Sequence, residues 1–178
     1  MKKRPLIHIG YCKTGTTWLQ NHVFANPEFG FSTPLDRALL REKIAYPHDL
    51  QFDPDALRSR IEAAIDKADE DGLVPVFSEE RFAGLIHAGG IDSRILADRL
   101  AQVFPTGRFL IVVREQKSMI RSAYAEYIKV GGSLALRHYL TEYLPMSLAL
   151  FDYDYYKYSH LVKYYQHLFG KDRVLVLP

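Results

Sequence analysis

The start of the chain holds the feature that most constrains its fold, an apolar run followed at once by a glycine-bearing loop. Residues Pro5–Ile9 read PLIHI, and Gly10–Trp18 read GYCKTGTTW. The apolar run predicts a buried strand, and the residues from Thr16 to about Phe24 predict a helix. A glycine-bearing turn from strand to helix aims backbone N–H groups at one point, where the helix dipole also attracts an anion. The sequence therefore predicts an anion-binding loop.

The rest of the chain continues the alternation of short apolar runs and amphipathic segments. We expect three more strands, at Val74–Phe77, Phe109–Val113 and the final RVLVLP run, Arg173–Pro178. We expect further helices that begin after Asp53 and after Asp92 as N-caps, and two more at Gln116–Lys129 and about Phe151–Phe169. The turn-rich residues between Asn26 and Asp53 are expected to form a long excursion. This alternation predicts an α/β fold, a three-layer, P-loop-like parallel sheet flanked by helices.

Parallel sheets of this kind bind ligands at the carboxyl ends of their strands. The segments Gly10–Thr17 and Ser78–Glu80 and the residue Arg114 each follow one of the expected strands. We therefore expect these three parts of the chain to lie together at one edge of the sheet.

Composition narrows the classes of protein. The chain has 178 residues, 48% of them hydrophobic, which is enough for one domain with a sizeable core. A net charge of +2 argues against a nucleic-acid binder. The single cysteine, Cys12, fits a reducing compartment. No run is long enough for a signal peptide or a membrane span, so we expect a cytoplasmic protein. The final strand has no helix after it, which suggests a domain, residues 1–178, that lacks its C-terminal part.

The loop almost matches the Walker A motif, G-x-x-x-x-G-K-[ST]. Gly10 and Gly15 have the required separation, and Thr17 takes the hydroxyl position. Thr16, however, stands in place of the lysine, and Lys13 is the loop's one lysine. In nucleoside triphosphate enzymes that missing lysine clamps the β- and γ-phosphates. The loop therefore favours a ligand with a single phosphate that carries a transferable group.

Two segments together resemble the sulfotransferases that use 3′-phosphoadenosine 5′-phosphosulfate (PAPS), in particular the bacterial and carbohydrate type. The first segment is similar to that family's 5′-phosphosulfate loop, matching it at Lys13, Thr14, Gly15, Thr16, Thr17 and Trp18. Cys12 stands where the family usually has proline. The second resembles the 3′-phosphate motif, with Arg114 after a strand and Ser122 eight residues later. Gln116 replaces the proline of that motif.

The resemblance implies roles for these residues. Arg114 and Ser122 would hold the 3′-phosphate, since a guanidinium can donate two parallel hydrogen bonds to a phosphate. Lys13 would stabilise charge on the bridging oxygen as the sulfuryl group leaves. Trp18 would stack on adenine; a place in the hydrophobic core is the equal alternative. Transfer of this kind does not demand a metal ion, and the sequence has no cluster with metal-ligand spacing.

A base must accept the proton of the acceptor's hydroxyl. The segment VFSEERF offers Glu79 and Glu80 directly after a strand. The family's Ser-x-Glu pattern falls on Glu80, so we expect Glu80 rather than Glu79 to be the base. The alternative is that both are a solvated acidic pair beside Arg81. His87 and His48 are fallback candidates, because small-molecule sulfotransferases use histidine.

The expected function is transfer of the sulfuryl group of PAPS to a hydroxyl or amine by in-line displacement. The resemblance implies a carbohydrate or glycolipid acceptor. The many tyrosines of the last third, including Tyr143, are expected to be mainly core. Two alternatives remain: a P-loop kinase-like nucleotide enzyme, and a nucleotide-binding module without catalysis.

Overall fold

A parallel sheet organises the computed structural model, which describes residues 3–141 and 150–178. Within these residues five strands are arranged in the order β2-β3-β1-β4-β5, and every pair is parallel. The strands are β1 (Leu6–Gly10), β2 (Phe31–Ser32), β3 (Val74–Ser78), β4 (Arg108–Val112) and β5 (Val174–Leu177). The predicted α/β class is therefore confirmed. In the central pairs, Leu6 lies opposite Val76 on one side and Arg108 on the other.

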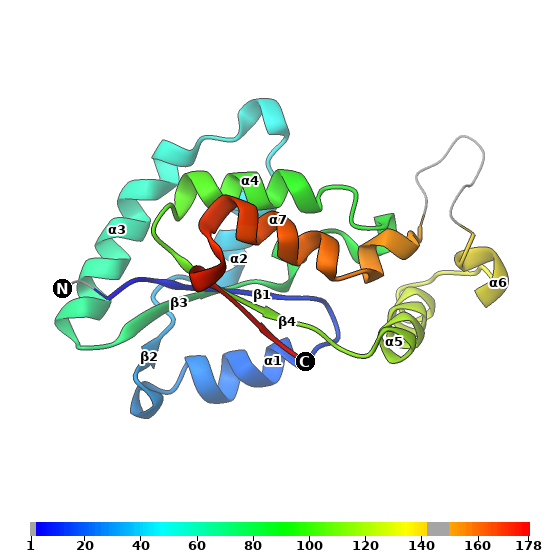
Figure 1. The fold of residues 1–178 in the computed structure, drawn as a ribbon, viewed down its shortest axis with the longest axis horizontal. Helices are drawn as coiled ribbons and strands as arrows, with labels where there is room; N and C mark the ends of the chain where they lie inside the picture. The colour runs from blue at the N-terminus through cyan, green and yellow to red at the C-terminus, as the bar shows by residue number, and fades with distance from the viewer. Residues whose placement is uncertain (1–2, 142–149) are drawn as a thin grey trace.

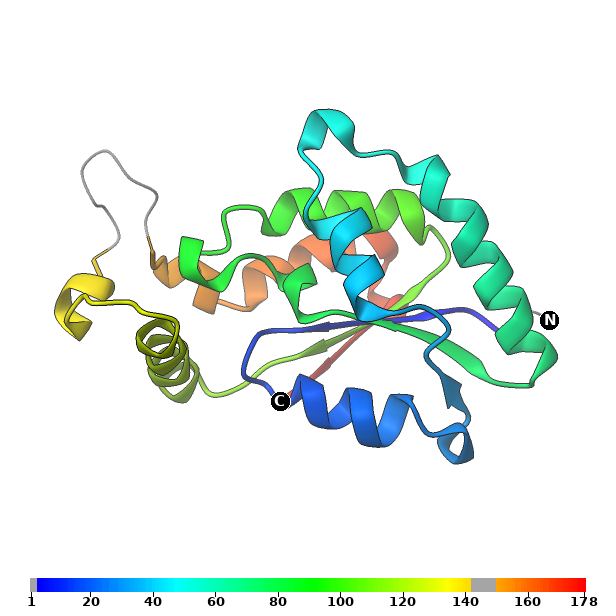
Figure 2. The ribbon, with the colours of Figure 1, turned by 180° about the vertical axis from the view of Figure 1, so that it is seen from behind.

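Helices cover both faces of this sheet. They are α1 (Thr16–Leu19), α2 (Arg37–Leu40), α3 (Pro54–Glu70), α4 (Ser93–Val103), α5 (Gln116–Lys129), α6 (Leu136–Tyr139) and α7 (Ser159–Phe169). Single π-helical turns, Gln20–Phe24 and Arg41–Ala45, continue α1 and α2. Figures 1 and 2 show α2, α3, α4 and α7 on one side of the sheet and α1 on the other. Helix α5 lies beyond the ends of the strands, next to the loop that follows β1.

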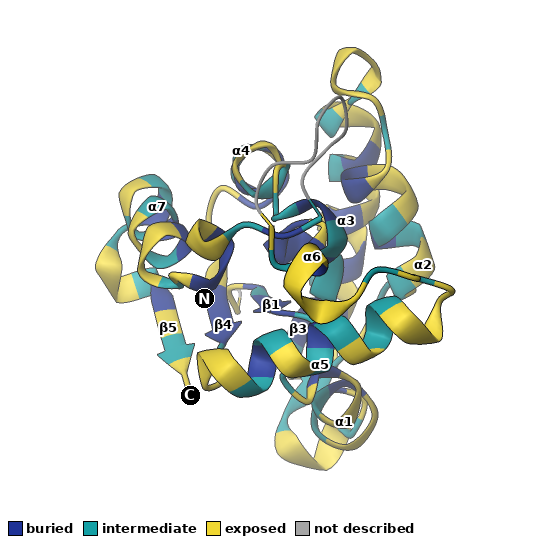
Figure 3. Cartoon of the chain, turned by 90° about the vertical axis from the view of Figure 1, so that its right-hand side faces the viewer, coloured by how far each residue is buried: buried dark blue, intermediate teal, exposed yellow. Residues whose placement is uncertain are grey.

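Alternation along the strands divides the core into two clusters, because successive side chains of a strand point to opposite faces. In β4, Phe109 and Ile111 belong to the larger cluster, with residues of α4 and α7. Leu110 and Val112 instead pack with Phe24, at the end of the α1 segment. Figure 3 shows β1, β3 and β4, the central strands of the sheet, as mostly buried. Both faces of β4 are therefore apolar, whereas β1 also buries the polar side chain of His8.

Helix boundaries were predicted well where a capping side chain marks them. Helix α5 has the predicted bounds, and the Glu115 carboxylate accepts hydrogen bonds from the amides of Lys117 and Ser118. Asp53 caps α3 in the same way, through the amides of Asp55 and Ala56.

The prediction for Asp92 was wrong in its detail. Asp92 does precede α4, but its side chain makes no capping hydrogen bond. Its carboxylate accepts a hydrogen bond from the Leu85 amide at 2.8 Å and pairs with the Arg81 guanidinium. A nearby cation therefore outcompetes the helix amides for this carboxylate.

Two other regions also differ from expectation. The excursion after Asn26 contains β2, a short strand at the edge of the sheet, and helix α2. The tyrosine-rich helix is shorter than predicted, because Tyr153–Tyr156 form a separate 3₁₀ turn before α7 begins. In the last third of the chain four tyrosines are buried as expected, namely Tyr139, Tyr155, Tyr156 and Tyr165. Tyr143 lies outside the described residues. Among the described residues no helix is long and apolar enough to cross a membrane.

Candidate functional site

The loop after β1 is held tightly against its own helix. A Cβ atom on Gly10 would lie 2.0 Å from Cγ2 of Thr16, so this position cannot carry a side chain without moving the loop. Gly15 has φ of 80°, which glycine adopts without strain, and precedes the first residue of α1. The Thr14 hydroxyl donates to the Tyr11 carbonyl oxygen at 2.7 Å and closes the turn. The loop therefore presents the first amides of α1, which have no acceptor within the helix.

Both the backbone carbonyl and the side-chain ammonium group of Lys13 have partners. Its φ of 71° is unusual for a residue with a side chain. One N–H of the Arg114 guanidinium donates to the Lys13 carbonyl oxygen at 3.0 Å. At the other end, Nζ of Lys13 lies 3.2 Å from a carboxylate oxygen of Glu126, and this hydrogen bond lowers the pKa of Glu126.

The loop, the segment after β3 and helix α5 enclose a cavity of about 390 Å³. We call it the loop cavity. Its lining brings together seven of the site residues expected from the sequence, namely Lys13, Gly15, Thr16, Thr17, Glu80, Arg114 and Ser122. Cys12, Ile86 and Glu126 complete it. Of the remaining expected residues, Thr14 and Trp18 are absent from the lining; Thr14 instead makes the turn described above.

Glu126 is the charged cavity residue that the sequence predictions missed. It lies four positions after Ser122 on α5, and residues four apart on a helix share one face. That spacing was the signal in the sequence that could have identified it.

The two glutamates after β3 have opposite environments. Glu80 lines the cavity, and one of its carboxylate oxygens accepts a hydrogen bond from the Thr16 hydroxyl at 2.9 Å. Glu79 is fully buried, and its carboxylate oxygen lies 3.0 Å from Nη2 of Arg41 and 3.9 Å from Nε of Arg37. The alternative of a solvated acidic pair beside Arg81 is therefore wrong, and Arg81 pairs with Asp92 instead.

The aromatic and histidine candidates are clearly placed. Trp18 is 61% exposed, so its alternative place in the core is excluded, and its ring centroid lies 5.5 Å from that of His22. Stacking on adenine stays a prediction.

Neither His87 nor His48 lines the loop cavity. His87 lies beside Tyr139, and burial lowers its pKa. His48 accepts a hydrogen bond from the Leu50 amide and so caps a short 3₁₀ turn.

A buried polar network lies behind the loop. Nδ1 of His8 lies 2.7 Å from the Ser78 hydroxyl, which accepts a hydrogen bond from the side-chain amide of Gln20 at 2.8 Å. The Ser78 hydroxyl thus contacts both His8 and Gln20. Burial, together with the charge of Arg37, lowers the pKa of His8 to about 4, so the ring is neutral at pH 7.

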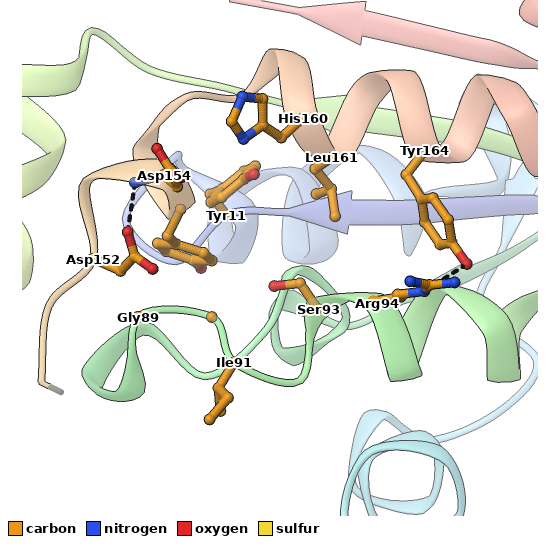
Figure 4. Close-up of a pocket in the computed structure, with 12 residues that line it drawn as sticks. Tyr11, Gly89, Ile91, Ser93, Arg94, Asp152, Asp154, His160, Leu161 and Tyr164 are labelled. Carbon is orange, nitrogen blue, oxygen red and sulfur yellow. Dashed lines mark hydrogen bonds between the residues drawn. The ribbon is translucent and has the colours of Figure 1, made fainter. Parts of the chain in front are cut away.

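A second cavity, of about 350 Å³, lies between the start of α4 and the segment that leads into α7. Figure 4 shows its walls, which include Tyr11, Ser93, Arg94, Asp152, His160 and Tyr164. Tyr155 also lines it, and the buried hydroxyl of Tyr155 has no hydrogen-bond partner among the described residues. The residues expected to bind the nucleotide or act in catalysis all lie outside this cavity.

Comparison with solved structures gives a similar fold. The crystal structure of a sulfotransferase from Alicyclobacillus acidocaldarius superimposes with a TM-score of 0.63 over 99% of this chain and 73% of that chain, at 19% sequence identity. No family model matches this chain. No curated protein matches it either. At this identity the likeness establishes the α/β fold of the chain.

The loop cavity has the groups for a transfer between an anionic donor and a protic acceptor. Backbone amides, hydroxyls and two cations can surround an anion, and Glu80 is a carboxylate that can take a proton. A guanidinium has five N–H donors, and Arg114 uses one on the loop. Several remain to bind a ligand.

Proposed function

We propose that this chain is a sulfotransferase that moves the sulfuryl group of PAPS to a hydroxyl or amine of an acceptor. The observation that carries the proposal is the meeting of Lys13, Thr16, Glu80, Arg114 and Ser122 in one cavity at the carboxyl ends of the strands. Segments that are far apart in the sequence contribute to it. The structural neighbour with the same fold, which is a sulfotransferase, supports the proposal.

The cavity residues fit the two phosphate groups of such a donor. The amides at the start of α1, those of Thr16 and Thr17 among them, and the hydroxyl of Thr17 would surround the 5′-phosphate, while the Thr16 hydroxyl stays bonded to Glu80. Arg114 and Ser122, on another wall, would hold the 3′-phosphate. Gly15 supports this fit, since a Cβ atom there would have open space around it and the backbone is accessible to a ligand. The volume of about 390 Å³ lies within the range of small-molecule sites.

Bound PAPS would supply a sulfuryl group attached to a phosphate leaving group. Glu80 would accept the proton of the acceptor's hydroxyl, and the hydrogen bond from Thr16 orients its carboxylate toward the cavity. Lys13 would neutralise the negative charge that develops on the phosphate side. Each of these residues lines the same cavity, so positioning and electrostatics supply the catalysis.

The acceptor class is proposed on narrower grounds. The carbohydrate-type sulfotransferases use a glutamate base at the position of Glu80, and this supports a carbohydrate or glycolipid acceptor. The small apolar contribution to the cavity, from Ile86, gives no reason to favour a flat hydrophobic acceptor.

Calorimetric titration with 3′,5′-adenosine bisphosphate, with and without Mg²⁺, tests the donor site. The wild type should bind without Mg²⁺, and Arg114→Ala should weaken binding about tenfold or more, because a charged hydrogen bond contributes about 1.5–3 kcal/mol. Arg121→Ala is the matched control, since Arg121 is exposed on the same helix and does not line the cavity.

Other outcomes would change the assignment. ATP binding that requires Mg²⁺, without binding of the bisphosphate, would refute the proposal and indicate a kinase-like nucleotide enzyme. Bisphosphate binding by a protein that shows no turnover with any hydroxyl- or amine-bearing acceptor would indicate a nucleotide-binding module.

A further inference from the structure

We propose that Glu126 is an exchangeable counter-ion of Lys13, which holds the ammonium group until the 5′-phosphate of the nucleotide takes its place. The inference rests on the proposed function and adds to it a residue that tunes affinity for the anionic donor. It starts from the contact between Nζ of Lys13 and the Glu126 carboxylate at 3.2 Å.

The pair lies inside the proposed donor site. Both Lys13 and Glu126 line the loop cavity, together with Arg114 and Ser122. Glu126 is therefore placed where a negative charge weakens the binding of an anionic ligand. The Glu126 carboxylate attracts Lys13 when the site is empty, and it would repel an anionic ligand when the site is occupied.

Exposure makes the pair easy to break. The side chain of Lys13 is 38% exposed and that of Glu126 is 33% exposed. Pairs this accessible to water contribute little stability, since solvent screens them and competes for both groups. Among the described residues, Lys13 is the one hydrogen-bond partner of the Glu126 carboxylate. Exchange of Lys13 from Glu126 to a phosphate therefore disrupts no other side-chain hydrogen bond of Glu126.

The backbone of Lys13 does not need to move during this exchange. Arg114 binds the Lys13 carbonyl oxygen at 3.0 Å, and the turn around Thr14 is closed by its hydroxyl. The long flexible stem of the lysine can redirect the ammonium group while the loop stays fixed. The loop makes a second contact with a carboxylate, the hydrogen bond from the Thr16 hydroxyl to Glu80. This bond would not exchange, because it orients the carboxylate of the proposed base.

A double-mutant cycle with three nucleotides tests the exchange. Dissociation constants of 3′,5′-adenosine bisphosphate, adenosine 5′-monophosphate and adenosine 3′-monophosphate are measured by calorimetry for the wild type, Glu126→Gln, Lys13→Met and the double variant. Glu126→Gln should bind the first two nucleotides about two- to fivefold more tightly, as expected for a pair of this exposure. The affinity for the 3′-monophosphate should not change, and Lys13→Met should abolish the gain.

Glu62→Gln provides the matched control for net charge, because Glu62 is exposed on α3 and lies outside the cavity. It should leave all three constants unchanged. A gain in affinity also separates the proposal from a merely structural role, since a variant that damages the fold would bind more weakly.

The outcomes distinguish this inference from the proposed function. If the wild type binds the bisphosphate but Glu126→Gln does not bind it more tightly, the inference is wrong and the proposed function stands. A gain that persists with Lys13→Met, or that extends equally to the 3′-monophosphate, also overturns the exchange, because it indicates a general charge effect. If the wild type binds none of the three nucleotides, both proposals are refuted.

Discussion

The loop cavity and the buried polar network directly behind it use similar residues in opposite ways. In the network, His8, Ser78 and Gln20 are at most 5% exposed, and hydrogen bonds of 2.7 and 2.8 Å join them. In the cavity, the ion pair of Lys13 and Glu126 is about one-third exposed. Removing one partner of a buried polar group lowers the stability of a protein strongly, whereas removing one partner of an exposed ion pair lowers it little. We therefore expect the network to contribute more to stability than the exposed ion pair of the cavity does.

Glu79 and Glu80 show this contrast within a single step of the chain. The buried Glu79 carboxylate lies close to the partly exposed guanidinium groups of Arg37 and Arg41, while that of Glu80 faces the cavity. The contact with Glu79 also raises the pKa of Arg41, first through the hydrogen bond between them. Adjacent identical residues thus have different environments because consecutive side chains leave the strand end in different directions.

The largest expected effect is on turnover. Glu80→Gln should lower the rate of sulfuryl transfer by about 10²–10⁴-fold, as loss of a general base does. Binding of 3′,5′-adenosine bisphosphate should persist. The rate is measured as bisphosphate formed from PAPS with an acceptor found by screening neutral sugars. A variant that retains wild-type turnover would show that Glu80 is not the base.

The second prediction concerns stability and a substitution of Glu79. Glu79→Gln should lower the free energy of unfolding by about 1.5 kcal/mol, because it removes the charge-assisted hydrogen bond between the buried Glu79 carboxylate and the partly exposed Arg41. Urea unfolding followed by circular dichroism measures the loss, and Glu80→Gln is the matched control, with a change below about 1 kcal/mol. Equal losses in the two variants would remove the distinction between the two regions.

A third prediction concerns pH and the network. The pKa of His8 is about 4 in the folded protein and 6.5 for an unperturbed histidine, so the unfolded chain binds the extra proton between these values. The stabilising contribution is therefore present above pH 6.5 and is lost as the pH falls toward 4. Between pH 7 and pH 5 the loss should be about 2 kcal/mol.

His8→Gln isolates this contribution, because glutamine does not titrate. Urea unfolding at the two pH values should show a smaller decline for the variant than for the wild type. Parallel declines would mean that other groups cause the acid sensitivity.

Much of the fold was predictable from local signals. The start of α3 was placed correctly because Asp53 is a capping residue next to a clear helical pattern, and the bounds of α5 also agree with the prediction. Strand β2 was missed because it has two residues, which is too short for a periodic pattern. Asp92 was misassigned because its partner, Arg81, lies eleven residues away and becomes a neighbour only in the folded chain.

The site was predictable to the extent that strand ends identify it. Parallel pairing of β1 with β3 and β4 brings Lys13, Glu80 and Arg114 to one edge, as their positions after strands suggested. The roles of these residues in catalysis stay predictions. The network of His8, Ser78 and Gln20 could not be anticipated, because its hydrogen bonds join residues 58 and 70 positions apart.

The hydrogen bond from Arg114 to the Lys13 carbonyl also bears on the order of folding. It joins residues 101 positions apart, and the Tyr11 amide likewise donates to the carbonyl of Val112, in β4. The loop can reach its native conformation only after β1 and β4 have paired across that long separation, and such distant contacts form slowly. We therefore expect the native conformation of this loop to appear late in folding, after the central strands have paired.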